Sequence, residues 1–290
     1  AAREFVACSG VVPTIFCVTD PTVSGPALLL GLADLVVMVA DTYAFVSGTH
    51  MVRQFTGEEL SNEGLGGAKM HERTSGVAHF TVADRSEADD LIVELLSFLP
   101  DHTDQVPAGW PCADPVDRPT PEAGDLVPDT ATGSYDVRDV IACVVDDGHL
   151  LEPRAQWAPN LVTAFASIGG RPVGVIANQP QSVAGTLDIA ASQKGARFVS
   201  FCDAFNLPLV TFVDTSGFYP GKDLEWRGMI RYGAQMAFAY ARATVPRVCL
   251  TPRKSYGGAY IVMDSRYMAN DIMLAWPSAV VSYTPLTLLP

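Results

Sequence analysis

The sequence predicts an α/β protein with a mostly parallel sheet, built as two related halves. Three observations support this prediction. Strand-like apolar runs alternate with stretches of helical periodicity in the second half of the chain, as expected for parallel strands joined by right-handed crossover helices. A proline-rich stretch separates two apolar parts, and a gapless internal match indicates that these parts share one fold.

Composition limits the classes of protein to which this chain can belong. Of its 290 residues, 48% are hydrophobic and 18% are charged, which is typical of a globular protein with a substantial core. The formal net charge of −13 repels polyphosphate, so we expect no nucleic-acid partner. A small anionic ligand remains compatible with this charge, because a few well-placed bases suffice to bind it.

In the first part, two apolar runs, VVPTIFCV and LVVMVADTYAFVSG, predict buried strands, with a helix between them around Pro26 to Asp34. A later helix is expected to begin with Ser86 as its N-cap and to be stopped by Pro100. Its predicted apolar face consists of Leu91, Ile92, Leu95 and Leu96.

The middle of the chain is rich in proline. Seven of the 21 prolines fall between Pro100 and Gly133. Because proline removes backbone donors and fixes φ, this stretch predicts a surface linker, with domains at 1–100 and 135–290 and the linker at 101–134. A long excursion within one domain is the alternative.

After this stretch the elements follow in order. Two β-rich runs joined by Gly169-Gly170 predict a hairpin in VTAFASIGGRPVGVIANQ. A helix in ASQKGARFVSFCDAFN, a strand in LPLVTFVD, a longer helix in LEWRGMIRYGAQMAFAYARA and a strand in VPRVCL come next.

The internal match supports two copies of one fold. An offset of 233 places VPTIFCVTDPTVSGPALLL over VPRVCLTPRKSYGGAYIVM without a gap, so that Gly25 falls on Gly258. With small gaps, Asp34 and the apolar run after it meet Asp271 and IMLAW.

The sequence predicts a cytoplasmic protein without a metal site. Asp34 interrupts the most apolar segment, Gly25 to Ala40, which is too short to cross a bilayer, and the first residues do not resemble a secretion signal. The six cysteines form no CxxC pair, which favours reduced thiols over disulfides or zinc.

Familiar catalytic motifs are absent from the sequence. There is no GxSxG, HExxH or GxxxxGK[ST], and the five histidines are scattered. The carboxylate pairs Asp146-Asp147 and Asp89-Asp90 are expected to be solvated, because neighbours point apart. What remains is two glycine-rich turns after apolar strands, whose N–H groups suit an oxyanion. Ordinary turns that need glycine for their backbone angles are the alternative.

These turns lie in a sequence that resembles the carboxyltransferase (β) subunits of biotin-dependent acyl-CoA carboxylases, of the propionyl-CoA carboxylase type. The resemblance covers nearly the whole chain in order. The stretches that carry it include SGVVPTIFCV, MVRQFTGEEL, GLGGAKMHERTSGVAHF, LDIAASQKGARFVSFCDAFNLPLVTFVDTSGFYPG, TPRKSYGGAYIVM and ANDIMLAWPSA. It implies two crotonase-like halves, the first incomplete at its N-terminus and the second at its C-terminus, with a divergent tail after Ser282.

The resemblance also implies an activity, a cofactor and partners. A carboxyl group passes from carboxybiotin, carried on a partner, to the α-carbon of an acyl-CoA, while backbone oxyanion holes stabilise the enolate and ureido oxygens. The implied partners are a biotin carboxylase and a biotin carboxyl carrier subunit, and the implied assembly is a dimer-based hexamer. A biotin-dependent decarboxylase or transcarboxylase, and an assembly subunit without activity, remain as alternatives.

Carried over by residue, the resemblance assigns the second-half hole to Gly258 and Ala259, with Gly217 and Phe218 on a facing turn. Tyr260 and Ile261 follow this hole and are expected to line the acyl pocket, where an apolar Ile261 suits an uncharged alkyl chain.

Two bases and a divergent turn complete the predicted site. Arg253 and Lys254 are expected to steer an anionic substrate or to neutralise oxyanion charge, with solvation at the surface as the alternative. In the first half the family has alanine-glycine-glycine-alanine where this chain has Val23-Ser24-Gly25-Pro26. Pro26 has no N–H, so the first hole is expected to rely on Ser24 and Gly25.

Overall fold

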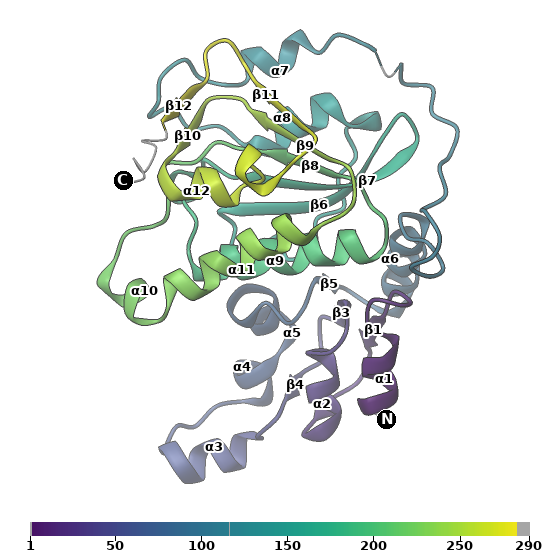
Figure 1. Cartoon of the computed structure of the whole chain (residues 1–290). Coiled ribbons are helices and arrows are strands. Elements are labelled where there is room, and N and C mark those ends of the chain that lie inside the picture. Colours follow the sequence, from purple (N-terminus) through teal and green to yellow (C-terminus); the bar gives the residue numbers. More distant parts are fainter. Residues whose placement is uncertain (1, 116, 283–290) are drawn as a thin grey trace. The chain divides into compact units, whose positions relative to one another are not determined.

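A computed structural model describes residues 2–115 and 117–282, and the chain folds as two compact units (Figure 1). Unit 1 comprises Ala1–Val106 and Pro153–Ala158, and unit 2 comprises Pro107–Glu152 and Pro159–Pro290. The predicted boundaries of two domains and a linker at 101–134 stay a prediction. The tail predicted to diverge after Ser282 lies outside the described residues.

Unit 1 is built on a parallel sheet in the order β1-β3-β5, beside a small parallel pair of β2 and β4. Its elements are α1 (Ala2–Cys8), β1 (Ile15–Val18), β2 (Thr22–Val23), α2 (Gly25–Leu30), β3 (Leu35–Val39), β4 (Ala44–Phe45), α3 (Thr49–Thr56), α4 (Asn62–Gly66), α5 (Ala68–Met70), η1 (His71–Ser75), β5 (Phe80–Val82) and α6 (Arg85–Ser97). Every residue of β3 is buried, because this strand lies in the middle of the sheet.

The predicted start of α6 is wrong. Its N-cap is Asp84, whose Oδ1 accepts a hydrogen bond of 3.0 Å from the N–H of Glu87, and the carboxylate of Glu87 accepts one in return from Ala83. This reciprocal capping satisfies N–H groups that Ser86, already inside the first turn, is not placed to reach. On the predicted apolar face Leu95 is buried, but Leu96 is exposed.

Unit 2 contains a five-stranded sheet in the order β11-β9-β8-β7-β6, and a parallel pair of β10 and β12. Its elements are α7 (Pro121–Asp125), α8 (Val137–Val144), η2 (Asp146–Gly148), β6 (Leu161–Ile168), β7 (Arg171–Asn178), η3 (Val183–Gly185), α9 (Ile189–Ala204), β8 (Leu209–Phe212), α10 (Lys222–Trp226), α11 (Met229–Arg242), β9 (Arg247–Thr251), β10 (Lys254–Tyr256), α12 (Gly257–Val262), η4 (Arg266–Met268), β11 (Ile272–Ala275) and β12 (Val280–Ser282). The β6–β7 hairpin is antiparallel and the other neighbours in the large sheet are parallel, as predicted.

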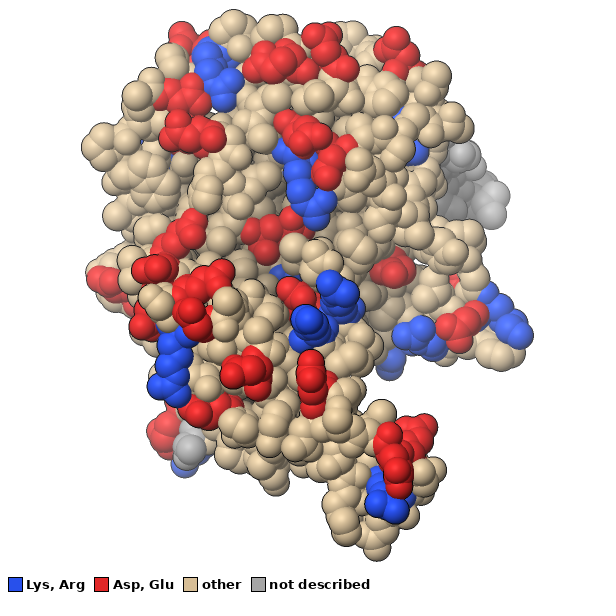
Figure 2. All heavy atoms as spheres, turned by 180° about the vertical axis from the view of Figure 1, so that it is seen from behind, with Lys and Arg blue, Asp and Glu red and all other residues tan. Residues whose placement is uncertain are grey.

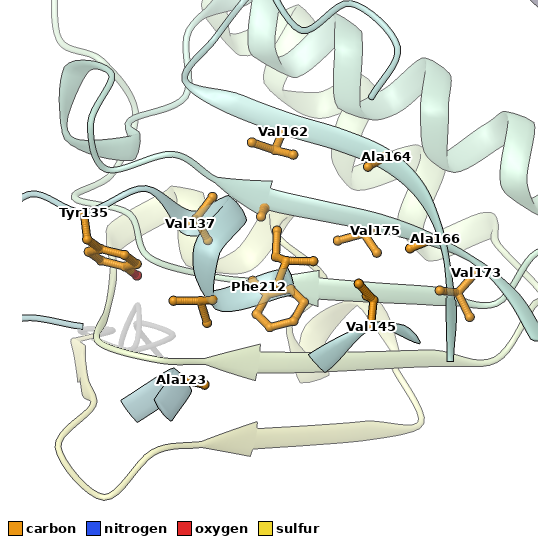
Figure 3. Close-up of a cluster of buried hydrophobic side chains, with 13 residues drawn as sticks. Ala123, Tyr135, Val137, Val145, Val162, Ala164, Ala166, Val173, Val175 and Phe212 are labelled. Carbon is orange, nitrogen blue, oxygen red and sulfur yellow. The ribbon is translucent and has the colours of Figure 1, made fainter. Parts of the chain in front are cut away.

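Helices cover both faces of this sheet, with α9 and α11 on one face and α8 on the other (Figure 1). Side chains of β7 alternate between the two sides: Val173 and Val175 join a core with α8, while the position of Gly174 faces Cys202 of α9. The core on the α8 side also includes Ala123 of α7, so part of the proline-rich stretch is packed into unit 2 (Figure 3).

The single long helix predicted after β8 is wrong, because it is divided into α10 and α11. Gly228 separates them with φ of 95°, a conformation that ends one helix and starts the next in a new direction.

The internal match predicted from the sequence is confirmed in the hydrogen bonds of both units. In unit 1 the N–H of Thr14 donates to Asp34 Oδ2 at 2.9 Å, and in unit 2 the N–H of Arg247 donates to Asp271 Oδ2 at 2.8 Å. Each aspartate ties the start of one strand to the start of its parallel neighbour, β1 to β3 and β9 to β11. A short parallel pair and a short helix, α2 or α12, then follow in each unit. The prediction of two halves with one fold is therefore correct.

The prediction that Asp146 is solvated is wrong. This residue is buried and its two carboxylate oxygens each accept a hydrogen bond of 2.8 Å, from the N–H groups of Gly169 and Gly170. Burial opposes its ionisation, but hydrogen bonds from Gly170, Ser167 and Gly169 hold the pKa of Asp146 below its ordinary value. Asp146 thus fixes the tight turn of the β6–β7 hairpin.

A buried ion pair near β9 predicts a pH dependence of stability. Asp264 is fully buried 2.6 Å from Arg247, and burial raises the pKa of this carboxyl to about 7. Its pKa is lower in the unfolded chain, so its contribution to stability is complete below about pH 4 and is lost as the pH rises through about 7, by at most about 4 kcal/mol. Replacing Asp264 by Asn should flatten this part of the stability curve.

Urea unfolding of both proteins at intervals between pH 4 and 8 measures the difference. If the free energy of unfolding of the wild type falls with pH no more steeply than that of Asp264→Asn, the raised pKa of Asp264 is contradicted.

Candidate functional site

The two glycine-containing turns predicted from the sequence meet in unit 2. A parallel bridge joins Thr215 to Ser255, through hydrogen bonds from Thr215 N–H to Lys254 O at 2.9 Å and from Tyr256 N–H to Thr215 O at 3.2 Å. The turn that contains Gly217 therefore lies against the strand that leads into Gly257 and α12. The structure brings these segments together although about 40 residues separate them in sequence.

Backbone N–H groups of these turns differ in whether they are already bonded. The N–H of Gly217 donates to Thr215 Oγ1 at 3.2 Å, so this predicted donor is in use. The N–H of Leu187 donates to Gly217 O, and the carbonyl oxygen of Leu187 accepts a hydrogen bond from the N–H of Tyr219. Because N–H groups alternate in direction along an extended strand, the N–H of Phe218 points away from Leu187. Gly258 and Ala259 lie in the first turn of α12, where N–H groups have no partner within the helix. Phe218, Gly258 and Ala259 are therefore the better donors.

The ring of Phe218 packs against two glycines, Gly258 and Gly233. A Cβ atom at Gly258 would lie 3.3 Å from the Phe218 ring, and one at Gly233 of α11 would lie 3.1 Å from it. Two glycines thus let an aromatic ring pack closely between α11 and α12. The surface next to the exposed Gly258 is consequently apolar.

Tyr260 and Ile261 are the next two residues of α12, and they make different contacts. The hydroxyl of Tyr260 lies 3.7 Å from Met273 Sδ, and its ring packs edge to face with Tyr267. Ile261 is half-buried, and its carbonyl accepts a hydrogen bond from Ser265. Both residues directly follow the candidate donors, and their role in an acyl pocket stays a prediction.

Arg253 and Lys254 are buried, so the alternative of surface solvation is wrong. Arg253 is 6% exposed and binds Asp214 Oδ2, at 2.9 Å, and the carbonyl oxygens of Thr130 and Gly133. Lys254 is 5% exposed and donates to the carbonyl oxygen of Ala131 at 3.2 Å, and burial lowers its pKa. Arg253 directly precedes β10 and Lys254 is its first residue, so both lie just before the turn.

Sequence reasoning missed Tyr135 and Asp214. The Tyr135 hydroxyl donates to Asp214 Oδ2 at 2.8 Å, and burial, followed by the charge of Asp214, raises the pKa of Tyr135. Asp214 could have been found from its position, since an acid directly after an apolar strand and before a glycine turn is poised at the sheet edge. Tyr135 carries no such signal, because 79 residues separate it from Asp214.

In unit 1, the corresponding turn has fewer donors. Ser24 adopts φ of 60°, close to the 62° of its counterpart Gly257, and its N–H donates to Phe45 O at 2.8 Å. Pro26 has no N–H, which leaves the exposed Gly25 as the backbone donor of this turn. The expectation that Ser24 supplies a backbone donor here is not supported by this geometry.

Other kinds of site are less evident in the described part of the chain. Within residues 2–115 and 117–282 no three His, Cys, Asp or Glu residues are grouped as metal ligands, and no helix is long and apolar enough to span a membrane. On the face drawn in Figure 2, basic side chains stand among acidic ones and do not form a broad patch.

Comparison with known proteins identifies relatives of this chain. Residues 1–283 match the family described as the carboxyl transferase domain. The propionyl-CoA carboxylase beta chain of Saccharopolyspora erythraea is 46% identical over 283 residues, which are 94% of this chain and 52% of the relative. The methylmalonyl-CoA decarboxylase subunit alpha of Veillonella parvula is 43% identical over 278 residues, or 94% of this chain and 54% of that subunit.

A solved structure is similar to this chain over nearly all of its length. The crystal structure of transcarboxylase 12S, described as a hexamer assembly with methylmalonyl-coenzyme A and methylmalonic acid bound, matches with a TM-score of 0.95 and 43% identity. The match covers 97% of this chain and 55% of that one. The chain thus spans about half the length of the relatives that it matches.

Proposed function

The chain belongs to the carboxyl transferase domain family, and we propose that it transfers a carboxyl group from carboxybiotin to the α-carbon of an acyl-CoA as the carboxyltransferase component of an acyl-CoA carboxylase. The observation that supports this proposal most strongly is the bridge between Thr215 and Ser255, which joins the turn before Phe218 to the strand that leads into Gly258 and Ala259. Neutral donors of this kind suit a carbonyl oxygen that becomes negative during reaction.

The donor set fits the groups that such a reaction brings. A thioester carbonyl and a ureido carbonyl are both neutral acceptors, and the apolar ring of Phe218 and the side chain of Ile261 offer no competing charge. Carboxybiotin on a partner supplies carbon dioxide and, at its ureido nitrogen, a base for the α-proton. The residues of this chain then have two tasks: N–H groups stabilise the enolate oxygen, and side chains exclude water.

Gly258 and Ala259 hold the oxygen on one side and Phe218 on the other in this proposal. Because the donors belong to rigid backbone, they need no rearrangement as charge develops on the oxygen. Tyr260 and Ile261 border the acyl group. Arg253 and Lys254 are too deeply buried to meet substrate directly, so neither is expected to contact it.

The wider assignment follows from the same family. We propose a cytoplasmic homo-oligomer, in the family a hexamer built from dimers, that works with a biotin carboxylase and a biotin carboxyl carrier subunit. The biotin is carried on that partner.

Two alternatives have specific support. A decarboxylase or transcarboxylase role is favoured by a methylmalonyl-CoA decarboxylase subunit and by transcarboxylase 12S, each of which is 43% identical to this chain. An assembly role without catalysis is favoured by Pro26 and by the bonded N–H of Ser24, which leave the first-half turn short of donors.

Carboxylation of a series of acyl-CoAs tests the proposal. The protein, in its full natural length and with its biotin-bearing partner carboxylated, should convert short acyl-CoAs to α-carboxylated products that mass spectrometry detects. An acyl chain with a carboxylate at its end should react more slowly, because Ile261 offers it no partner. Assembly with the partner but no product from any acyl-CoA would support the assembly role instead.

A further inference from the structure

Three buried polar side chains contact one another next to the bridge that joins the two turns of unit 2. Asp214 is fully buried, and its Oδ2 accepts two hydrogen bonds, one from the Tyr135 hydroxyl at 2.8 Å and one from Arg253 Nε at 2.9 Å. Arg253 also lies over the Tyr135 ring, with Cζ 5.0 Å from its centroid. We call Tyr135, Asp214 and Arg253 the buried triad.

The buried triad joins three segments that are distant in sequence. Arg253 Nη1 donates to the carbonyl oxygens of Thr130, at 2.9 Å, and Gly133, at 2.7 Å, and Tyr135 follows two residues later. Asp214 is the residue immediately before Thr215, which forms the bridge to Ser255. The segment 130–135, the Gly217 turn and the start of β10 are therefore held at one point.

Stability alone does not account for this arrangement. A buried ion pair is often no more stabilising than apolar residues of the same volume. Among the described residues, Asp214 Oδ1 and Arg253 Nη2 find no hydrogen-bond partner, and each such buried atom costs free energy. Polar groups that are kept in a core at this cost, next to a candidate site, point to a role in that site.

Connectivity shows how the buried triad can act on the donors. Asp214 lies four residues before Phe218, and Arg253 lies five residues before Gly258. The two intervening stretches are hydrogen-bonded to each other through Thr215, so a displacement of either side chain is expected to reach the turns. A shift of about 1 Å at a reacting group can reduce rate on the order of 100-fold.

We propose that Tyr135, Asp214 and Arg253 are positioning residues, which fix the spacing between the N–H of Phe218 and those of Gly258 and Ala259. The segment 130–135, from the end of the proline-rich stretch, is part of this device because Arg253 and Tyr135 hold it to the sheet edge. The proposal rests on the proposed function, since it concerns the same donors. None of the three side chains touches substrate; they act through the backbone of the turns.

Replacement of Tyr135 by Phe tests the proposal with the smallest change. It keeps the ring beneath Arg253 and removes only the hydroxyl that donates to Asp214. Tyr240→Phe is the matched control, since Tyr240 is also buried and its hydroxyl lies 3.0 Å from Thr211 Oγ1, in the core between α11 and β8. Each variant removes one buried hydrogen bond, so both should lower the midpoint of urea unfolding by a similar amount.

Kinetics separate positioning from stability. In carboxyl transfer, Tyr135→Phe should lower kcat about tenfold while the KM for acyl-CoA changes less than about twofold, because only the donors that meet the transition state move. Tyr240→Phe should change neither. Arg253→Lys should retain more of kcat than Arg253→Met, because it keeps the charge beside Asp214. Equal kcat values for Tyr135→Phe and Tyr240→Phe would overturn the proposal.

Hydrogen exchange gives a second readout that does not depend on activity. Amides of 130–135, 215–218 and 256–259 should exchange faster together in Tyr135→Phe, and should keep wild-type rates in Tyr240→Phe. If the wild-type protein transfers no carboxyl group, the proposed function fails and this exchange pattern alone decides the positioning proposal. Faster exchange confined to 130–135 would overturn it.

Discussion

Replacing Ala259 by Pro should reduce the rate of carboxyl transfer by about 100- to 1,000-fold, the usual effect of removing one oxyanion donor. Proline removes the N–H at the third position of α12, where no backbone hydrogen bond of the helix is lost. The chain itself shows that proline fits such a turn, because Pro26 occupies the matching position of α2.

Ala259→Gly is the control for this variant, since it keeps the N–H and changes only the side chain. Its kcat should stay within a few-fold of wild type, while the circular dichroism spectrum and melting temperature of Ala259→Pro show that it is folded. Similar kcat values for the two variants would mean that Ala259 is not a donor.

Replacing Pro26 by Ala should have the opposite effect and raise kcat at least about tenfold, because it restores a donor to the first-half turn. Ser24 there already has φ of 60°, almost that of Gly257, so the backbone is shaped like the second-half turn but lacks the N–H. The measurement is steady-state carboxyl transfer by both proteins under one set of conditions.

Pro26→Gly is the matched second variant, because it also restores the N–H but makes the backbone more flexible. Both substitutions should increase kcat, Ala more than Gly. An unchanged kcat in both, with wild-type assembly, would show that the first-half turn does not contribute a donor at Pro26.

Much of the fold could be predicted because local patterns determine it. The Gly169-Gly170 hairpin, the strand and helix order of unit 2 and the repeated aspartates, Asp34 and Asp271, depend on spacing that a single sequence displays. The two glycine turns could be found for the same reason. Their proximity follows from parallel strands, whose carboxyl ends meet at one sheet edge.

Burial of charge could not be predicted in this way. Arg253 is buried because carbonyl oxygens more than 100 residues away bind it, and Asp146 is buried because the hairpin offers it two N–H groups. Sequence neighbours reveal neither partner. The break at Gly228 was missed because helical periodicity continues on both sides of it, and a glycine within a helix is tolerated often enough to give no clear signal.

The central claim, that the backbone donors of unit 2 support carboxyl transfer, is tested most directly by a reaction that needs no protein partner. The protein is mixed with free biotin and an α-carboxylated acyl-CoA carrying ¹³C in its carboxyl group. If the claim is right, labelled carboxybiotin and decarboxylated acyl-CoA form in equal amounts, and Ala259→Pro loses this activity while Ala259→Gly keeps it. Binding of the acyl-CoA without any transfer of label to biotin would contradict it.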